Sequence, residues 1–334
     1  EMSASLVGSE MCIRDSDNNV NLEQVELKPS TEPMLHEGLH TEEDFQRIRD
    51  KKAAGEEPWV SAYQLLVESQ FSQKTADTYP TEWIKRGVSG DENYMNAARG
   101  ATIAYQQALR WKIEQDDEYA AKAVENLNKW VQTCVGVTGN TNLSLAAGLY
   151  GYEFAIAGEL LRDYGGWDRA DFAAFQNWLL KVFYPANDDF LKRHHDTNAL
   201  HYWANWCLCN IAAKMAIGIV TDRRDIYNEG IAHLQTGDTN GRLRRAIYHD
   251  YAPDYNFAQW QESGRDQGHT LMCVGLMGVI CQLAWSQGDD FFAYDDNLFL
   301  RACEYAACCN YTNETVPYLS LIHISEPTRL ALIS

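Results

Sequence analysis

Apolar residues recur every three or four positions along most of the chain from His40 onward, and this period predicts helices. Two helices are expected early, one after the capping box that begins at Thr41 and one directly after Pro58. Residues 17–34 are polar, and we expect an extended lead-in there. The other expected helices cover approximately residues 92–114, 117–134, 143–163, 168–183, 201–220, 223–235, 263–286 and 296–310.

No stretch alternates apolar and polar residues over the length of a strand, so we expect no major sheet and at most a short hairpin near 245–260. About ten helices joined by short links favour antiparallel helix pairs. Two layers of such pairs around a ring, an α/α toroid, would bury the apolar stripes and leave a central groove. A helical repeat array is the alternative, but no fixed-period repeat is found. We therefore expect one all-α domain, an (α/α)n toroid or incomplete α/α barrel.

The two ends of the chain differ from the rest of it. One DNA encoding of residues 319–334 has a complementary strand that encodes residues 1–16. Two unrelated protein ends would not be complementary strands of one DNA, and the pair resembles a sequencing adapter read in both directions. We expect both ends to be adapter artefacts, and residues 17–318 to be a domain truncated at both ends of its gene.

The composition of the 334-residue chain excludes several classes of protein. With 46% hydrophobic residues, 10 Trp, 18 Tyr and 11 Phe, the chain is too apolar to be disordered. A net charge of −19 argues against binding to nucleic acid or to an anionic membrane surface. No run of about 18 apolar residues suggests a transmembrane helix. The cysteines lack the spacing of a zinc site and are interpreted as small buried side chains.

Six of the nine histidines lie between residues 194 and 269, where the candidate chemistry gathers. The first segment, RHHDTNALHYWANWCLCN at 193–210, places His201 and Asn205 on one helix face if a helix begins near Asn198. An amide and an imidazole are costly to bury without partners. Both are therefore either satisfied core groups or groups that point into a groove.

The second segment is WQESGRDQGHT at 260–270. Ser263 and Asp266 have the spacing of a capping box, with Asp in the place of Glu or Gln. Arg265 and His269 are four residues apart on the first turns of the helix expected there. A structural cap needs only Ser263 and Asp266, so the additional polar residues favour a functional site.

Two other segments are weaker candidates. NGRLRRAIYHDYAP at 240–253 carries three arginines and two tyrosines near a turn, which suits an anionic ligand as well as a solvated basic turn. GNTNLSLAAGLYGYEF at 139–154 places Asn142 at the start of a helix. His194 and His195 fall in the loop before HYWANW, where exposure to solvent is the default.

At these segments the chain resembles the alginate lyase superfamily of polysaccharide lyases, most closely polysaccharide lyase family 38. The similarity covers most of residues 35–318, through LHEGLHTEEDFQRIRDKKAAGEEPW, AAGLYGYEFAIAGELLRDY, HYWANWCLCNIAAKMAIGIV, QWQESGRDQGHT and NYTNETVPY. It implies an α/α toroid and β-elimination on a 1,4-linked polyuronate, with a 4,5-unsaturated uronate end as the product. It also implies that the reaction needs no metal and no cofactor.

This chemistry has three requirements. A neutraliser binds the uronate carboxylate so that the C5 proton becomes acidic, a base removes that proton, and an acid protonates O4 of the leaving sugar. Carried onto this chain, Asn205 with His201 is the expected neutralising pair, assisted by Arg265. Three residues are candidates for the base, and the first is also the expected acid: Tyr248, His194 and His269.

Seven further residues are expected to bind substrate: Asn142, Trp203, Arg242, Trp260, Gln261, Glu262 and Gln267. One departure affects the neutraliser. The better-known lyase branch places Asn-His directly before its SYWAAW helix, where this chain has Ala199 and Leu200. The assignment to Asn205 is therefore our own inference.

The sugar geometry suits a tyrosine in two roles. β-D-mannuronate and β-D-glucuronate share their configuration at C4 and C5, so the C5 hydrogen and O4 lie on one ring face. One phenol can then remove and return the proton, provided that nearby cations lower its ordinary pKa of about 10. The expected substrate is accordingly mannuronate-rich alginate or glucuronan.

Two alternatives stay open. A toroid glycoside hydrolase acting on oligouronides would need a general acid from Glu262, Asp254 or Asp266, whereas a non-catalytic carbohydrate-binding protein would need aromatic platforms without a base. For the lyase we expect an anionic polysaccharide as partner, no nucleic acid and no membrane. We also expect a monomer that is periplasmic or secreted.

Overall fold

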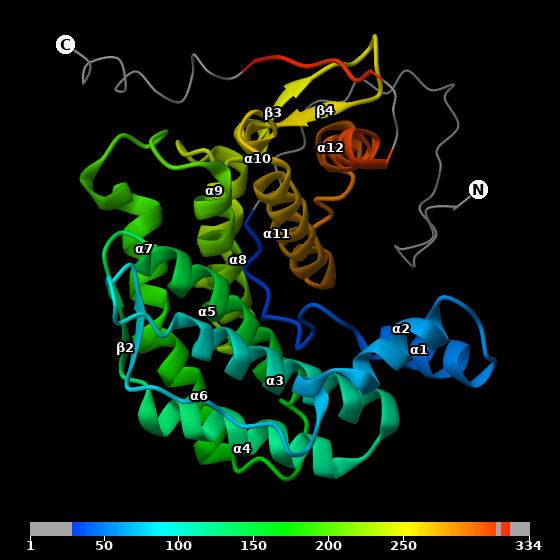
Figure 1. The fold of residues 1–334 in the computed structure, drawn as a ribbon, viewed down its shortest axis with the longest axis vertical. Helices are drawn as coiled ribbons and strands as arrows, with labels where there is room; N and C mark the ends of the chain where they lie inside the picture. Colours follow the sequence, from blue (N-terminus) through cyan, green and yellow to red (C-terminus); the bar gives the residue numbers. More distant parts are fainter. Residues whose placement is uncertain (1–28, 312–314, 321–334) are drawn as a thin grey trace.

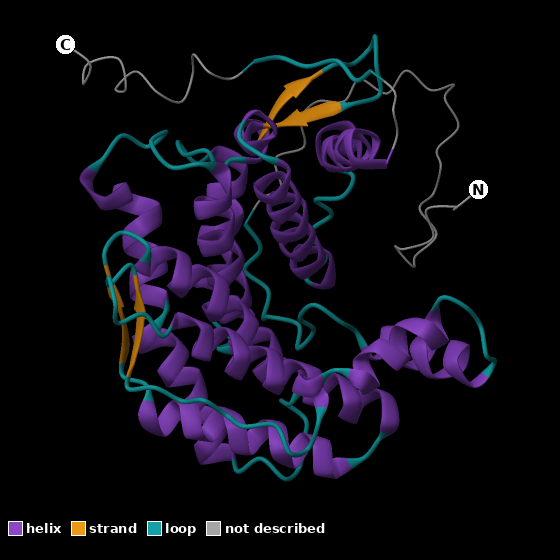
Figure 2. Ribbon diagram, in the orientation of Figure 1, coloured by secondary structure: helices purple, strands orange, loops and turns teal. Residues whose placement is uncertain are grey.

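The computed structural model describes residues 29–311 and 315–320. Its longer helices are α1 (Glu42–Ala53), α2 (Trp59–Glu68), α3 (Tyr94–Glu114), α4 (Asp117–Thr133), α5 (Leu143–Leu160), α6 (Arg169–Val182), α7 (Tyr184–Arg193), α8 (Ala204–Val220), α9 (Arg224–Thr236), α11 (Gln267–Ser286) and α12 (Tyr294–Tyr311). The short elements are α10 (Leu243–Ala246), η1 (Gln70–Ser72), η2 (His194–Asp196), η3 (Gln261–Gly264) and the strands β1 (Trp83–Arg86), β2 (Gly136–Gly139), β3 (Ile247–Asp250) and β4 (Ala258–Trp260). Figures 1 and 2 show that helices joined by loops dominate the described fold, with two small two-stranded sheets.

The helices form two layers. In the inner layer α5 packs between α3 and α8, and α8 packs on α11. In the outer layer α4 covers α3, and α7 and α9 cover α8 (Figure 1). The apolar residues follow this arrangement, because α8 is buried almost throughout while α4 is buried on one side only. The expected all-α toroid architecture is confirmed.

The inner helices α5 and α8 run in the same direction. A Cβ atom added to Gly148 would lie 2.5 Å from Sγ of Cys209, and one added to Gly151 would lie 3.5 Å from Cβ of Ala213. Because the contacts advance together along both helices, the helices are parallel. Their N-terminal ends, where backbone N–H groups lack intrahelical partners, therefore lie at one end of the molecule.

A two-stranded parallel sheet fixes the neighbouring helix starts. Strands β1 and β2 precede α3 and α5 and pair along their length, from Trp83 with Gly136 to Arg86 with Gly139. Gly139 has φ of 146°, and a side chain there would collide with the carbonyl oxygen of Arg86. The sequence does not predict this sheet, because its strands are four residues long and far apart in the chain.

The expected hairpin near 245–260 is confirmed. Strand β3 pairs antiparallel with β4, with Ile247 opposite Trp260 and His249 opposite Gln259. Tyr248 is the extra residue between these two pairs and therefore occupies a β-bulge.

The N-terminal segment crosses the opposite end of the molecule, where α5, α8 and α11 finish. Arg224 donates to the carbonyl oxygens of Glu32 and Pro33, at 2.8 and 2.9 Å. The Gln287 side chain exchanges hydrogen bonds with the backbone N–H and carbonyl of Leu35. The described part of the expected lead-in, residues 29–34, is indeed non-helical.

Two predicted helix starts are wrong. The helix expected from residue 201 begins at Ala204, and the one expected from residue 263 begins at Gln267 after the turn η3. Helix α7 was not expected at all. In α12 the residues 295–297 have positive φ, so the regular helix starts at Leu298.

Residues 1–16 and 321–334, expected to be adapter sequence, lie outside the described residues. Leu319 is described, and its backbone exchanges hydrogen bonds of 2.9 and 2.8 Å with the buried side chain of Gln259. The expectation about the chain ends stays a prediction.

Helix α11 is long and apolar enough to cross a membrane by length and composition alone. Here it is an inner helix packed on α8, and Cys273, Met277 and Ile280 on it are fully buried. The core helix of a soluble protein passes the same test, so this helix is weak evidence for a membrane span.

Candidate active site

The start of α8 is capped by residues far along the chain. Trp203, its N-cap residue, offers no side-chain hydrogen bond. Instead Oε1 of Gln261 accepts from the backbone N–H of Ala204 at 2.8 Å, and Oε1 of Glu262 accepts from that of Asn205 at 3.3 Å. The turn η3 thereby satisfies two of the orphan donors of α8.

Glu262 is completely buried, and burial raises the pKa of its carboxyl group above the ordinary range. The nearest cation is the guanidinium of Arg265, whose Nη1 lies 3.6 Å from Oε2 of Glu262. Gln261 is also buried, and the indole N–H of the fully buried Trp260 donates to the carbonyl of Ala302. All three side chains are covered by protein and two of them cap α8, so the expected contacts of Trp260, Gln261 and Glu262 with substrate stay predictions.

Asn205 and His201 do not share a helix face. His201 precedes α8 and is exposed, with its ring 5.0 Å from that of Tyr202. Asn205 is 3% exposed, its Oδ1 has no hydrogen-bond partner among the described residues, and its Nδ2 lies 3.8 Å from Sδ of Met272 on α11. The amide is thus a buried polar group that the described protein leaves unsatisfied.

Arg265 lies between the N-terminal ends of α8 and α11. Its guanidinium lies 5.6 Å from the centre of the Trp203 ring, in a cation–π arrangement. Its side chain is 32% exposed, so it is open to solvent on one side while Glu262 and Asp266 lie within 4 Å on the other. Trp203 is half-buried and supports the guanidinium.

Asp266 caps α11 and orients His269. Its Oδ1 accepts from the His269 backbone N–H at 2.8 Å, and its Oδ2 lies 2.6 Å from Nδ1 of the ring. The two hydrogen bonds from His269 hold the pKa of Asp266 below its usual range. An ionised carboxylate only accepts, so Nδ1 carries the proton and Nε2 of a neutral ring is the basic atom.

The three arginines of residues 240–253 have different partners. Arg244 pairs with Asp295, and Arg245 donates to the carbonyl of Asp238. Arg242 has no ion pair with any described residue, and its Nε is buried without a partner. Arg244 is therefore the only one of the three with an ion pair to a described residue, and Arg242 also keeps an unpartnered Nε for an anionic ligand.

Tyr248 is half-buried at the bulge of the β3–β4 hairpin. A bulge turns a side chain out of the regular alternation, and bulges recur beside active sites. No hydrogen bond to the Tyr248 hydroxyl is formed within the described chain. The same hairpin leads directly into Gln261 and Glu262, so Tyr248 is tied to the cap of α8 through β4.

The expectation of an exposed His194 is wrong. It is 2% exposed, in the left-handed conformation, with Nε2 3.6 Å from Sγ of Cys207. Burial, with a smaller contribution from His195, lowers the pKa of His194 to about 4. His195 is more accessible, and its Nε2 lies 3.0 Å from Oγ of Ser144 in the first turn of α5.

Arg86 was missed from the sequence. It ends β1 beside Gly139, at the same end of the molecule as the start of α5, and its guanidinium lies 4.6 Å from the centre of the Tyr94 ring. Its Nη1 is buried without a partner, and no acidic side chain among residues 29–311 and 315–320 pairs with it. Only the parallel pairing of β1 with β2 reveals its position. The nearby Asn142 is half-buried and bonded to Oδ1 of Asn140.

The structure therefore joins part of the predicted site. Asn205, Glu262 and Arg265 form one connected cluster, with Trp203 against Arg265. No hydrogen bond, ion pair or ring contact between described residues joins Tyr248 to that cluster directly. Gln267 is exposed in the first turn of α11. Within the described ranges, no three His, Cys, Asp or Glu side chains form a group that could hold a metal ion.

Residues 48–314 match the model of the family named Alginate lyase. The chain belongs to the alginate lyase family. By that membership it is a polysaccharide lyase, and the expected superfamily is confirmed. No protein of curated function matches the sequence significantly.

Solved structures of alginate lyases share the fold. One is an alginate lyase from Bacteroides ovatus, with a TM-score of 0.62, 14% identity, and coverage of 85% of this chain and 86% of that chain. Another is alginate lyase A1-III from Sphingomonas species A1, with a TM-score of 0.58, 13% identity, and coverage of 83% and 80%. A tyrosine-to-phenylalanine variant of A1-III complexed with a tetrasaccharide gives a TM-score of 0.60 at 14% identity, with coverage of 83% and 79%. At these identities the likeness establishes the fold alone.

Proposed function

We propose that this protein cleaves a 1,4-linked polyuronate, mannuronate-rich alginate or glucuronan, by β-elimination that needs no metal. The observation that carries the proposal is the set of unsatisfied groups at the inner helix starts. Arg242 and Arg86 have no acidic partner, and the Asn205 amide oxygen has no hydrogen-bond partner among the described residues. Parallel helix N-termini add positive potential at the same end, which favours a polyanion despite the net charge of −19.

Each step of the elimination has a candidate group. Arg265, with the Asn205 amide beside it, neutralises the uronate carboxylate so that the C5 proton becomes acidic. Tyr248 removes that proton and returns it to O4 on the same ring face, and Nε2 of His269 is the second candidate base. His194 is less suited to the task because burial lowers its pKa to about 4, which makes its imidazole a weak base.

Glu262 plays a supporting role in this scheme. Its carboxylate holds the backbone of Asn205 and lies beside Arg265, so it positions both groups that are proposed to neutralise the uronate carboxylate. The glycoside hydrolase alternative loses two of its three candidate acids, because Glu262 is covered by protein and Asp266 is engaged by His269. The third, Asp254, is exposed in the loop between β3 and β4.

A substrate panel tests the proposal. The protein is incubated with polymannuronate, glucuronan and polyguluronate, and the ultraviolet absorbance of the conjugated double bond is followed, since only elimination forms this bond. We expect product from one or both of the first two polymers, with and without a metal chelator. Absence of unsaturated product from every polymer, or new reducing ends without the double bond, would exclude the lyase function.

Arg265→Ala sharpens the assignment of the neutraliser. We expect turnover to fall on the order of 100-fold, as for loss of one electrostatic stabiliser, with little change in thermal unfolding. Arg169→Ala is the matched control, because Arg169 is an exposed arginine in the first turn of α6. Equal rates for the two variants would remove Arg265 from the mechanism.

A periplasmic or secreted location also belongs to the proposal. Polymeric uronates are too large to cross a membrane unaided, so a lyase that cuts them must meet them outside the cytoplasm. Fractionation of cells that express the complete gene tests this, and activity confined to the cytoplasm would contradict it.

A further inference from the structure

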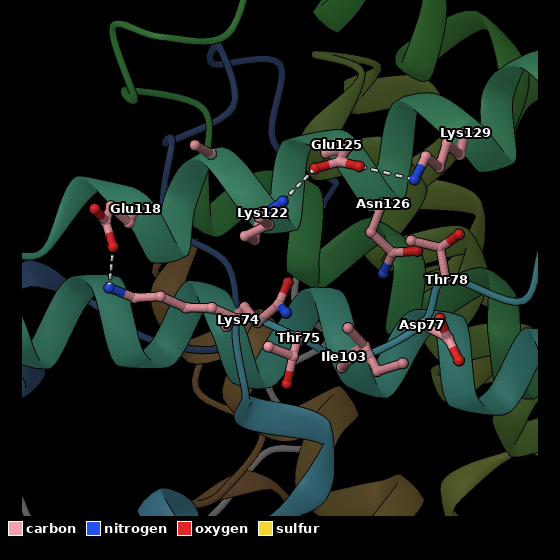
Figure 3. A pocket seen from close by; sticks show the side chains of 13 residues that line it. Lys74, Thr75, Asp77, Thr78, Ile103, Glu118, Lys122, Glu125, Asn126 and Lys129 are labelled. Carbon is pink, nitrogen blue, oxygen red and sulfur yellow. Dashed lines mark hydrogen bonds and ion pairs between the residues drawn. The ribbon is translucent and has the colours of Figure 1, made fainter.

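Many ion pairs of the described chain lie at the surface. In Figure 3, Lys122 and Lys129 of α4 donate to Glu125 at 2.8 and 2.7 Å, and all three side chains are nearly half exposed. Exposed pairs of this kind contribute little to a structure. Arg301 of α12 differs, because its side chain is only 5% exposed and one of its partners is a carboxylate on another element.

Arg301 joins α12 to the end of β3. Its Nη2 donates to Oδ2 of Asp250, the last residue of β3, at 2.6 Å. Its Nη1 donates to the backbone carbonyl and to Oδ2 of Asp296, which belongs to α12 itself. The Asp250 side chain is 21% exposed and that of Asp296 is 69% exposed. Water therefore screens the contact with β3 less than the contact within α12.

Both carboxylate oxygens of Asp250 are engaged. Oδ1 accepts from the backbone N–H of Ala252 at 3.1 Å. Oδ2, which accepts from Arg301, also lies 3.7 Å from Nη1 of Arg244. The carboxylate thus ties α12 to the backbone of the turn that follows β3.

The contacts with α12 bracket the bulge that contains Tyr248. On one side of the bulge, the indole N–H of Trp260 donates to the carbonyl of Ala302 at 3.0 Å. On the other side, Asp250 accepts from Arg301. Arg301 and Ala302 are consecutive residues of α12, which packs against the hairpin (Figure 1). A bulged residue has no ladder partner of its own, so the place of Tyr248 depends on these two anchors.

We infer that Arg301 is a positioning residue for Tyr248, and that it acts through Asp250 by holding the β3–β4 hairpin where the phenol reaches the C5 hydrogen of the sugar. The inference rests on the proposed function, in which Tyr248 moves that proton. Arg301 is buried under the hairpin, so its effect passes through Asp250 and not through contact with substrate. A displacement of about 1 Å in a reacting group lowers turnover roughly 100-fold.

The test compares Arg301→Gln with Arg110→Gln. Arg110 of α3 is the matched control, because it is also buried and paired with a carboxylate, that of Glu114. We expect both variants to unfold at lower temperature. Arg301→Gln should lower kcat on polymannuronate about 10-fold to 100-fold with KM within about threefold, whereas Arg110→Gln should leave kcat within about twofold. Arg301→Lys keeps one charged donor for Asp250 and should recover part of the lost kcat.

A double-variant cycle separates positioning from general damage to the fold. If Arg301 acts through Tyr248, then Arg301→Gln should cause no further loss of turnover in the chain that already carries Tyr248→Phe. Equal losses with and without Tyr248→Phe, or an unchanged kcat in Arg301→Gln, would overturn the inference. Asp250→Asn breaks the same contact from the hairpin side and takes the place of Arg301→Gln if that variant does not fold.

Fluorine NMR follows Tyr248 without catalysis. In the chain labelled with fluorotyrosine, the resonance that disappears in Tyr248→Phe belongs to Tyr248. We expect this resonance to shift or broaden in Arg301→Gln and to stay unchanged in Arg110→Gln. If the parent chain forms no unsaturated product but the resonance still responds, the proposed function fails and the positioning by Arg301 stands. A resonance that does not respond to Arg301→Gln overturns the inference.

Discussion

The two ends of the inner helices differ in whether their polar groups have partners. At the C-terminal end, Arg162 bonds Glu159 at 2.8 Å and the carbonyls of Ile219 and Val220 at 3.2 and 3.0 Å. At the N-terminal end, Arg242 has no acidic partner and its Nε is buried without a partner in the described chain. The same helices therefore end in a satisfied network on one side and in unsatisfied polar groups on the other.

This difference separates stability from function. A cation at a helix C-terminus that also meets a buried carboxylate contributes to folding. Buried polar groups without hydrogen-bond partners lower stability, and such groups are found most often at functional sites. Substitutions at the two ends should accordingly affect different measurements.

Tyr248→Phe should have the largest effect at the N-terminal end. We expect turnover to fall roughly 100-fold to 10,000-fold, the range for loss of a general acid or base. Unfolding should change little, because the hydroxyl makes no hydrogen bond within the described chain. Initial rates of unsaturated product and thermal unfolding measure the two quantities. Full activity of Tyr248→Phe would indicate that His269 is the base, and His269→Ala would then test that assignment.

Arg162→Ala should have the largest effect at the C-terminal end. Removing the guanidinium leaves Glu159 buried without its cation, which costs about 3–5 kcal/mol in the free energy of unfolding. Lys51→Ala is the control, because Lys51 pairs with Glu56 on the surface and should cost less than about 1 kcal/mol. Denaturation in urea measures the free energy of unfolding of both variants. Equal losses would contradict the claim that the buried pair at the C-terminal end contributes more to stability than a surface pair.

Glu153, midway along α5, should give a smaller effect that depends on pH. Burial raises the pKa of its carboxyl group from 4.5 to about 8, and no described residue pairs with it. The folded state then binds more protons than the unfolded state, so stability falls as pH rises from about 4.5 to about 8. The full shift would correspond to about 5 kcal/mol at about 1.4 kcal/mol per pKa unit. Because Glu153 is only half-buried, we expect Glu153→Gln to remove a smaller decline, on the order of 1–3 kcal/mol. An unchanged slope in urea titrations across this range would contradict the assignment.

The sequence predicted the regular helices well. The ranges 117–134 and 143–163 became Asp117–Thr133 and Leu143–Leu160, because these helices carry clear apolar periods and turn residues on both sides. The start of α8 could not be predicted, since its caps are the side chains of Gln261 and Glu262, 57 residues away. Distant capping leaves no local pattern.

The candidate site could be predicted only in part, because some of its residues meet through contacts between distant parts of the sequence. Arg265 and Asn205 lie in distinctive segments and do come together through Glu262. The sequence does not show burial, so it could not tell that Glu262 and Trp260, a polar and an aromatic side chain typical of ligand sites, lie under the surface. Arg86 belongs to a strand whose partner is 53 residues away, since Arg86 pairs with Gly139, so no local signal marks it.

The parallel run of α5 and α8 has one more consequence. Histidines lose their charge as the solution becomes alkaline, but a peptide dipole has no proton to give up. The attraction that these helix ends exert on a carboxylate should therefore persist at alkaline pH, where a uronate chain stays fully ionised.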